Sequence, residues 1–522
     1  MKDIGELYRI KEIRLGWDVF KTSHYSILGR GTEMVDTQAL QLILDKKKEI
    51  LSGDSVKIAK QHSEGKLTAR ERVKKLLDDA SFVETDALLC DSNDYPGVVT
   101  GSGTINDRAV YVIAQEYTVH GGAMGVSQAR KINRILDMAL NTGAPVVFIF
   151  DSAGVRVDEG AQAMNAFSSV SARLVKLSGY CPIISIIDGP VIGGAAMLAQ
   201  ISDVSVAVKN GSAMMLYGPT VIGSITGKNL KSEEIGGADV LGSNGAVSLV
   251  ADDEDTAMML CRRILDYLPG CSLEATEVTD TDDINRLISI PDAADAASLL
   301  KEVADNGEYV ELNTEYGKAI KTVFCRVGGH SCGILCSDPA YHDGMIDTEA
   351  ALKASRFIRI CDCYDLPLIS LIDSKGTAVP DETDHMLAMK TASSLMFSYA
   401  EATCPKVSVI TGNAIGQSFI ALSGKEQADM IFAWPGSIIS ALTPEAAVQV
   451  MYTDELRKGA SRFELETAFA TDTAGAVSAA RCGLVDDVIE PSETRKYLIH
   501  AIEMLESKSE PYKEKKHGIM PL

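Results

Sequence analysis

The sequence predicts an α/β protein that consists of two copies of one domain. Short apolar strands alternate with helical segments along the chain, as in layered α/β domains. At 522 residues the chain is too long for one ordinary core and suits two domains of about 200 to 250 residues. Several short motifs also occur twice, in the same order and at one spacing, which indicates a tandem duplication.

The composition excludes some classes of partner. The formal net charge of −22 argues against a nucleic-acid or anionic membrane surface, which would require clustered Lys and Arg. The 11 cysteines are scattered, partly within apolar runs, as expected in a reducing compartment. The longest apolar runs are too short to span a bilayer, and no secretory signal opens the sequence. We therefore expect a cytoplasmic protein without a nucleic-acid partner.

One group of side chains invites comparison with a zinc site. His330, Cys332 and Cys336 lie close in sequence, with Cys325 and His342 nearby. A closed CxxC pair is missing, and Cys332 and Cys336 alternate like the buried positions of a strand. We expect core cysteines and no metal.

The first residues have little helical periodicity. A helical pattern begins only after Met34, so we expect residues 1–33 to be an N-terminal extension. Two interpretations stay open: translation starts at Met34 and residues 1–33 are not native, or the extension packs on a partner.

A basic stretch, GKLTARERVKKLLDD, follows at Gly65 to Asp79. Its Lys and Arg side chains could meet a phosphate-bearing ligand. A solvated helix face balanced by neighbouring acids explains the stretch equally well.

The first copy then alternates strands and helices in order. We predict a hairpin, a glycine-rich loop, a helix, a buried strand and a second helix, in the ranges Val98 to Glu116, His120 to Gly125, Val126 to Asn141, Ala144 to Phe150 and Gly160 to Leu177. The buried strand leads into Asp151 and Ser152.

The next stretch, Cys181 to Asp203, predicts a strand, a turn and a helix start. The strand is Ile183 to Ile187, the turn runs through Asp188-Gly189-Pro190 into Gly193-Gly194, and the helix is Ala195 to Ile201. Glycines allow a sharp bend, and the free N–H groups of the helix start can face a negative oxygen. Taken alone, the stretch favours an ordinary connection.

The second copy changes that interpretation. His120, Lys131 and Asp151 recur 222 residues later as His342, Lys353 and Asp373, while Cys181 and Gly193 recur 223 later as Cys404 and Gly416. One inserted residue explains the change in spacing. We expect domains at 34–270 and 271–522, with the acidic, weakly patterned segment 271–296 as linker.

The second turn has a different composition. Gly416-Gln417-Ser418 stands where the first copy has Gly193-Gly194-Ala195. Two similar turns suggest two ligand oxygens, one in each repeat.

From about Gly65 to the C-terminus the chain resembles a known family, the carboxyltransferase subunits of biotin-dependent acyl-CoA carboxylases and decarboxylases, of the propionyl-CoA carboxylase β-chain type. The motifs that carry the resemblance are GKLTARERV, VVTGSGTI, TVHGGAMG, GAPVVFIFDSAGVRVDEG, DGPVIGGAA, YGPTVIGSITG, EEIGGADV, RFIRICDCYDLPL, FAWPGS, GLVDDVIEPSETR and KHGIMPL. The resemblance implies two crotonase-like domains, assembled as trimers or hexamers with active sites shared between subunits.

The resemblance also implies a reaction. A carboxyl group moves between biotin on a separate carrier protein and the α-carbon of a short-chain acyl-CoA of the propionyl/methylmalonyl or acetyl/malonyl type. The N-terminal domain would hold the thioester oxygen of the enolate in an oxyanion hole at Gly193, Gly194 and Ala195. The C-terminal domain would hold the biotin ureido oxygen at Gly416, Gln417 and Ser418, with biotin as the base.

Further site residues follow from the same resemblance. Those expected to bind substrate are Gly121, Gly122, Gly154 and Ile420, and those expected to bind biotin are Gly416 and Phe419. Asp151 and Asp373 are candidate acids, although turn-capping Asx bonds are the preferred role, and His120 and His342 are expected to be structural.

Partners and alternatives complete the expectation. The partners are a biotin carboxyl carrier protein and either a biotin carboxylase or a membrane decarboxylase, so the direction stays open. Where the family has glycine, this chain has Gln417, which leaves a non-catalytic acyl-CoA or carrier-binding subunit as an alternative. A hydratase is disfavoured because neither helix start carries a Glu.

Overall fold

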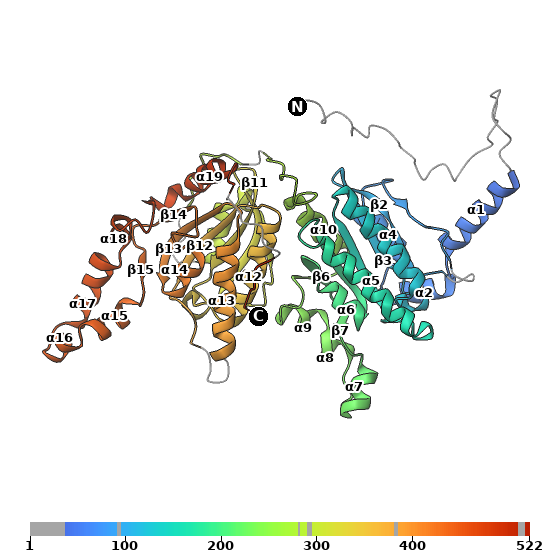
Figure 1. Ribbon diagram of the computed structural model, residues 1–522, viewed down its shortest axis with the longest axis horizontal. Helices are drawn as coiled ribbons and strands as arrows, with labels where there is room; N and C mark the ends of the chain where they lie inside the picture. The colour runs from blue at the N-terminus through green and yellow to red at the C-terminus, as the bar shows by residue number, and fades with distance from the viewer. Residues whose placement is uncertain are drawn as a thin grey trace, which may run out of the picture.

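The computed structural model describes residues 37–90, 95–279, 282–289, 295–379, 385–509 and 517–521. Within these residues the chain forms two eight-stranded sheets with matching strand orders, β1-β2-β3-β4-β5-β6-β8 with β7 on β5, and β9-β10-β11-β12-β13-β14-β16 with β15 on β13 (Figure 1). The predicted α/β fold with a tandem duplication is confirmed. Residues 1–33, the predicted extension, lie outside the described residues, and the domain boundary at 270/271 stays a prediction.

The strands of the two repeats correspond one to one. The first sheet contains β1 (Val83–Glu84), β2 (Val98–Ile105), β3 (Arg108–Gln115), β4 (Val146–Ser152), β5 (Ile183–Ile192), β6 (Val204–Val208), β7 (Ala213–Met215) and β8 (Leu249–Ala251). The second contains β9 (Tyr309–Leu312), β10 (Ile320–Val327), β11 (His330–Ser337), β12 (Leu368–Ser374), β13 (Lys406–Ile415), β14 (Met430–Ala433), β15 (Ile438–Ser440) and β16 (Asp487–Val488).

Helices cover both sheets. Those of the first repeat are α1 (Thr37–Ser52), α2 (Ser55–Ser63), α3 (Ala69–Leu76), α4 (Val126–Thr142), α5 (Ala161–Leu177), α6 (Gly194–Ala199), α7 (Pro219–Thr226), α8 (Ser232–Gly236), α9 (Ala238–Ser243) and α10 (Glu254–Tyr267). Those of the second are α11 (Ala296–Val303), α12 (Thr348–Cys363), α13 (His385–Glu401), α14 (Gln417–Leu422), α15 (Pro444–Met451), α16 (Thr453–Arg457), α17 (Arg462–Ala468), α18 (Ala476–Arg481) and α19 (Thr494–Leu505).

The strands that lead to the predicted turns are parallel neighbours. β3, β4 and β5 pair in parallel, and the register of β4 on β5 shifts between Phe150 and Ser152. The second repeat has the same shift, between Ile372 and Ser374. A bulge at this position bends the strand end toward the edge where the turns lie.

One local prediction was wrong. Asp188-Gly189-Pro190 does not form a turn, because β5 continues through Ile192. Beyond Ile187, β5 pairs with the short β7, starting with Pro190 opposite Ala213, and the chain turns only at Gly193. A proline is tolerated here because β5 is changing its partner strand.

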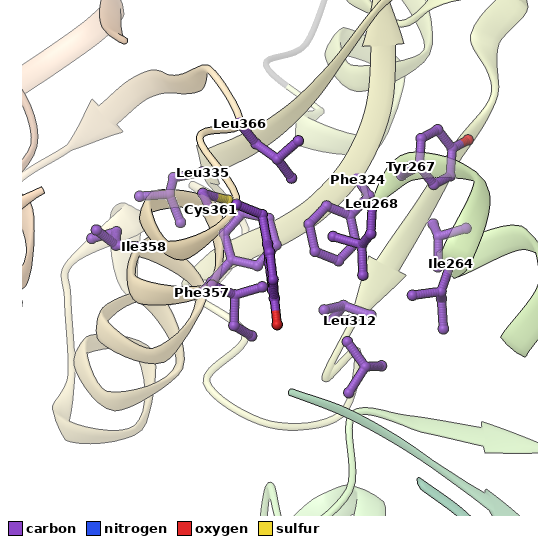
Figure 2. Close-up of a cluster of buried hydrophobic side chains, with 14 of the residues drawn as sticks. Ile264, Tyr267, Leu268, Leu312, Phe324, Leu335, Phe357, Ile358, Cys361 and Leu366 are labelled. Carbon is purple, nitrogen blue, oxygen red and sulfur yellow. The ribbon is translucent and has the colours of Figure 1, made fainter. Parts of the chain in front are cut away.

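A shared core joins the repeats. Figure 2 shows Ile264, Tyr267 and Leu268 from the end of α10 beside Leu312 and Phe324 of the second sheet, within one buried cluster.

Polar bonds support this contact between the repeats. The Tyr364 hydroxyl donates to Asp203 Oδ2 at 2.7 Å, and the Arg356 guanidinium donates to the Ser202 carbonyl. The side-chain amide of Asn313 donates to the Val247 carbonyl at 2.9 Å.

The cysteines follow the expectation of a core role. Cys325 and Cys332 are opposite each other on β10 and β11, and both are buried with Cys336. In the part of the chain that the structure describes, no group of three or more His, Cys, Asp or Glu side chains could hold a metal ion. No helix in the same part is long and apolar enough to cross a membrane.

Candidate active site

The first predicted turn is formed by Gly193. Its φ of 65° and ψ of −124° lie in a region that favours glycine, and the turn leads directly into α6. The Gly193 N–H donates to the Met215 carbonyl at 2.9 Å, so it is already used. The N–H groups of Gly194 and Ala195 come first in α6, which no described side chain caps.

The second turn has the same backbone. Gly416 has φ 52° and ψ −114°, its N–H donates to the Ser440 carbonyl at 2.8 Å, and α14 begins at Gln417. Ser418 is buried, and its hydroxyl donates to the Ile415 carbonyl at 2.9 Å. The N–H groups of Gln417 and Ser418 therefore take the places of those of Gly194 and Ala195.

A loop after the preceding strand lies beside each turn. Ser152 Oγ accepts the Gly154 N–H at 3.2 Å, and the Ala153 N–H donates to the Gly121 carbonyl at 2.8 Å. These bonds leave the N–H of Val155 without a hydrogen-bond partner among the described residues. In the second repeat the same count leaves Thr377, because Lys375, Gly376 and Ala378 donate elsewhere.

Each loop contacts the turn of its own repeat. A Cβ placed on Gly154 would lie 3.3 Å from the carbonyl oxygen of Ile192, the residue before Gly193. The matching distance from Gly376 to the Ile415 oxygen is 3.2 Å. Loop N–H and helix-start N–H groups thus come to one sheet edge in each repeat, an arrangement suited to an oxygen that carries negative charge. Sequence analysis missed Val155 and Thr377, since no side chain identifies them.

The side chains at the two helix starts differ. A Cβ on Gly194 would lie 2.7 Å from the Phe167 ring, so only glycine fits there without movement. Gln417 is exposed, and its Oε1 lies 3.9 Å from the Cβ position of Gly376. The second site therefore carries a carboxamide where the first has none.

The other predicted site residues surround these turns. Gly122 has positive φ and packs so closely on the Asp151 carbonyl that a Cβ would overlap it, while Gly121 accepts from Ala153. Phe419 is partly buried against the shared core, and Ile420 is exposed. His120 and His342 are exposed and have positive φ, at the start of η2 (His120–Gly122) and η5 (His342–Gly344).

Asp151 belongs to a buried ion network. Its Oδ2 receives Lys66 Nζ at 2.8 Å and Arg72 Nη1 at 2.9 Å, and Arg72 also pairs with Asp188 and Glu254. Burial raises the pKa of Asp151, although Arg72 and Lys66 act in the opposite direction. Burial likewise raises the pKa of Asp188 well above its ordinary value, against the attraction of Arg72.

Two interpretations of the sequence are corrected here. The basic stretch is neither a wholly solvated face nor an open phosphate site, because Arg72 is fully buried and Arg70 pairs with Glu84. Asp151 and Asp373 do not cap turns; the adjacent Ser152 and Ser374 do so. Asp373 instead accepts the Asn413 backbone N–H at 2.8 Å and its side-chain amide at 2.9 Å.

Comparison with known proteins agrees with this architecture. Residues 60–520 match the carboxyl transferase domain model. The chain is 36% identical to the methylmalonyl-CoA decarboxylase subunit alpha of Veillonella parvula, over 93% of this chain and 99% of that protein. It is also 36% identical to the propionyl-CoA carboxylase carboxyltransferase subunit of Haloferax mediterranei, over 92% of this chain and 98% of that protein.

A solved structure shows the same fold. The transcarboxylase 12S crystal structure with methylmalonyl-coenzyme A and methylmalonic acid bound superimposes with a TM-score of 0.88 at 32% identity, covering 95% of this chain and all of that one. That structure confirms the crotonase-like character expected of both domains. The chain therefore belongs to the carboxyl transferase domain family.

Proposed function

We propose that this carboxyltransferase moves a carboxyl group between biotin on a separate carrier protein and the α-carbon of a short-chain acyl-CoA of the propionyl/methylmalonyl type. The proposal depends above all on the two matched turns, each with a loop N–H and two helix-start N–H groups beside it. Two reacting partners that each develop negative charge on one oxygen require two such sites.

In the first repeat the N–H groups of Val155, Gly194 and Ala195 would receive the thioester oxygen as the α-proton leaves. Backbone donors in place before the reaction lower the cost of the enolate by several kcal/mol, about 3 for each donor. The assignment of residues 34–270 to the acyl-CoA side follows from this role.

In the second repeat the N–H groups of Thr377, Gln417 and Ser418 would receive the ureido oxygen of biotin, which places residues 271–522 on the biotin side. Biotin, when the carrier delivers it, supplies the carboxyl group and the nitrogen base. Asp151 and Asp373 are both bonded within the protein, which supports a mechanism without a side-chain base.

The retained backbone of the second turn supports an active site over a non-catalytic binding subunit. Every residue except proline has an N–H, so Gln417 keeps the donor that glycine would supply. Phe419 and Ile420 would then line the biotin and acyl pockets, and Gly121, Gly122 and Gly154 would shape the acyl-CoA site from below.

We also propose a homohexamer, because the similar transcarboxylase 12S structure is described as a hexamer assembly. Relatives named as decarboxylase and as carboxylase subunits occur at similar identity. The direction would then depend on the partner, a biotin carboxylase or membrane decarboxylase subunits.

The test uses the purified oligomer with methylmalonyl-CoA labelled in its free carboxyl group and free biotin as acceptor. We expect label in N-carboxybiotin and propionyl-CoA as the second product. An assembled protein that transfers no label from methylmalonyl-CoA or malonyl-CoA, yet binds acyl-CoA by calorimetry, would support the non-catalytic alternative.

A further inference from the structure

We propose that Arg72 is a positioning residue for the acyl-CoA half of the reaction, an inference that depends on the proposed function. Arg72 comes from α3, distant in sequence from both loops of the first site, and its side chain is fully buried. It touches neither turn directly, so it would act through Asp151 and Asp188.

The guanidinium joins the two strands that end at the site. Nη1 donates to Asp151 Oδ2 on β4 at 2.9 Å, and Nη2 donates to the Asp188 carbonyl on β5 at 2.8 Å. Nε lies 2.6 Å from Asp188 Oδ2, while Glu254 at the start of α10 accepts from Nη2 at 2.9 Å. A planar fork with five donors can make these contacts together, whereas an ammonium cannot.

These contacts lie at the bulge where β4 and β5 change register. Asp151 stands between Phe150 and Ser152, the residues at which the register shifts. Four residues further along, Val155 offers its unpaired N–H, and five residues after Asp188 the chain turns at Gly193. The distance between these two strand ends therefore sets the distance between the two kinds of donor in the proposed oxyanion hole.

The second repeat shows why the first needs this arginine. There Asn413 supplies both a backbone and a side-chain donor to Asp373. The equivalent residue in the first repeat is Pro190, which has no N–H, and Asp151 Oδ1 is buried without a hydrogen-bond partner. Arg72 and Lys66, bonded to Oδ2, replace the missing link between the strands.

The chain offers a matched control. Arg495 in α19 is also fully buried, bonded to Asp305, near Asp282 at 3.5 Å and bonded to the Asp283 carbonyl. It does not touch β12 or β13, the strands that lead to the second turn. Arg495→Lys thus disturbs a buried arginine network of the same kind away from either site.

The experiment compares Arg72→Lys, which keeps the charge, with Arg495→Lys and the unchanged protein. Two reactions are measured: transfer from methylmalonyl-CoA to free biotin, and decarboxylation of N-carboxybiotin without acyl-CoA. For Arg72→Lys we expect kcat of transfer to fall by about tenfold to a hundredfold while the second reaction stays within about twofold, since only the acyl-CoA hole loses its geometry. Arg495→Lys should lower the melting temperature and leave both reactions unchanged.

A second measurement does not require activity. Hydrogen exchange in the peptide that contains residues 151–156 should accelerate in Arg72→Lys and not in Arg495→Lys, while residues 373–378 should not respond to either. Equal acceleration in both loops, or equal losses in both reactions, would show a merely structural role and overturn the proposal. Absence of transfer in the unchanged protein would contradict the proposed function instead, and the exchange measurement would still decide the role of Arg72.

Discussion

In the first repeat the acid at the end of the strand, Asp151, is bonded to two cations, whereas in the second Asp373 is bonded to the backbone and amide of Asn413. The backbone they support is nearly identical: Gly193 and Gly416 differ by 13° in φ (65° against 52°) and 10° in ψ (−124° against −114°). The comparison shows that the duplicated fold preserves the path of the main chain while its side-chain support changes. Such a result is expected where main-chain N–H groups do the work.

The largest expected effect tests the crowding that is specific to the first turn. Gly194→Val would push a side chain into the Phe167 ring, 2.7 Å from the Cβ position, and displace the first turn of α6. We expect kcat of carboxyl transfer to fall by about 10²- to 10³-fold, the effect of losing one oxyanion donor. Adding Phe167→Ala should restore part of the rate; a double variant as slow as Gly194→Val would contradict the steric explanation.

A second prediction concerns a feature that both repeats share. Lys131 and Lys353 are buried, donate to backbone carbonyls, and burial lowers the pKa of each to about 8. Between pH 10.5 and 8 the unfolded chain takes up these protons and the folded chain does not, so each lysine lowers the free energy of unfolding by up to about 3 kcal/mol as the pH falls.

The measurement is urea unfolding of Lys131→Met, Lys353→Met and the unchanged protein from pH 7 to 10. The stability of each variant relative to the unchanged protein should be greatest at or below pH 8 and decline toward pH 10, by similar amounts in the two repeats. A relative stability that does not vary with pH would contradict the shifted pKa values.

A third prediction separates the repeats by the aspartate that immediately precedes β6 or β14. Asp203 accepts from the Ile183 N–H and from Tyr364 of the other repeat, and Asp429 accepts from the Lys406 N–H and from Lys508. Tyr364→Phe should lower the free energy of unfolding by about 1 to 3 kcal/mol, because the buried Asp203 loses a donor. Lys508→Met should cost less, since Asp429 is more exposed; equal losses in urea unfolding would argue against a special contact between the repeats.

The smallest expected effect concerns Gln417. Gln417→Gly should change kcat of transfer by no more than about threefold, because both residues supply the same backbone N–H at the second turn. The assay is transfer from methylmalonyl-CoA to free biotin. The control is Gln162→Gly, which places a glycine at another exposed position near a helix start, that of α5. A rise of a hundredfold for Gln417→Gly alone would mean that Gln417 had disabled the second site.

Much of the fold was readable from the sequence because its signals are local or repeated. The hairpin from Val98 to Glu116 was predicted by alternation and by the Asn106-Asp107 turn, and both turn residues have the positive φ that such a turn requires. The recurrence of His120, Asp151 and Gly193 at one spacing was enough to predict the duplication. The extent of β5 was misjudged, because pairing of Pro190 with β7 depends on a strand that is distant in the local pattern.

The sequence by itself determined the α/β class, the tandem repeat, the family and the two glycine turns, since periodicity, spacing and the need for positive φ are all written in residue types. Only the tertiary structure decided which N–H groups remain unpaired, because Val155 and Thr377 are selected by the bonds of their neighbours and not by their own side chains. It also decided that Arg72 is a core residue. Its partners Asp151 and Glu254 lie 79 and 182 residues away, and no local pattern can specify contacts at such a separation.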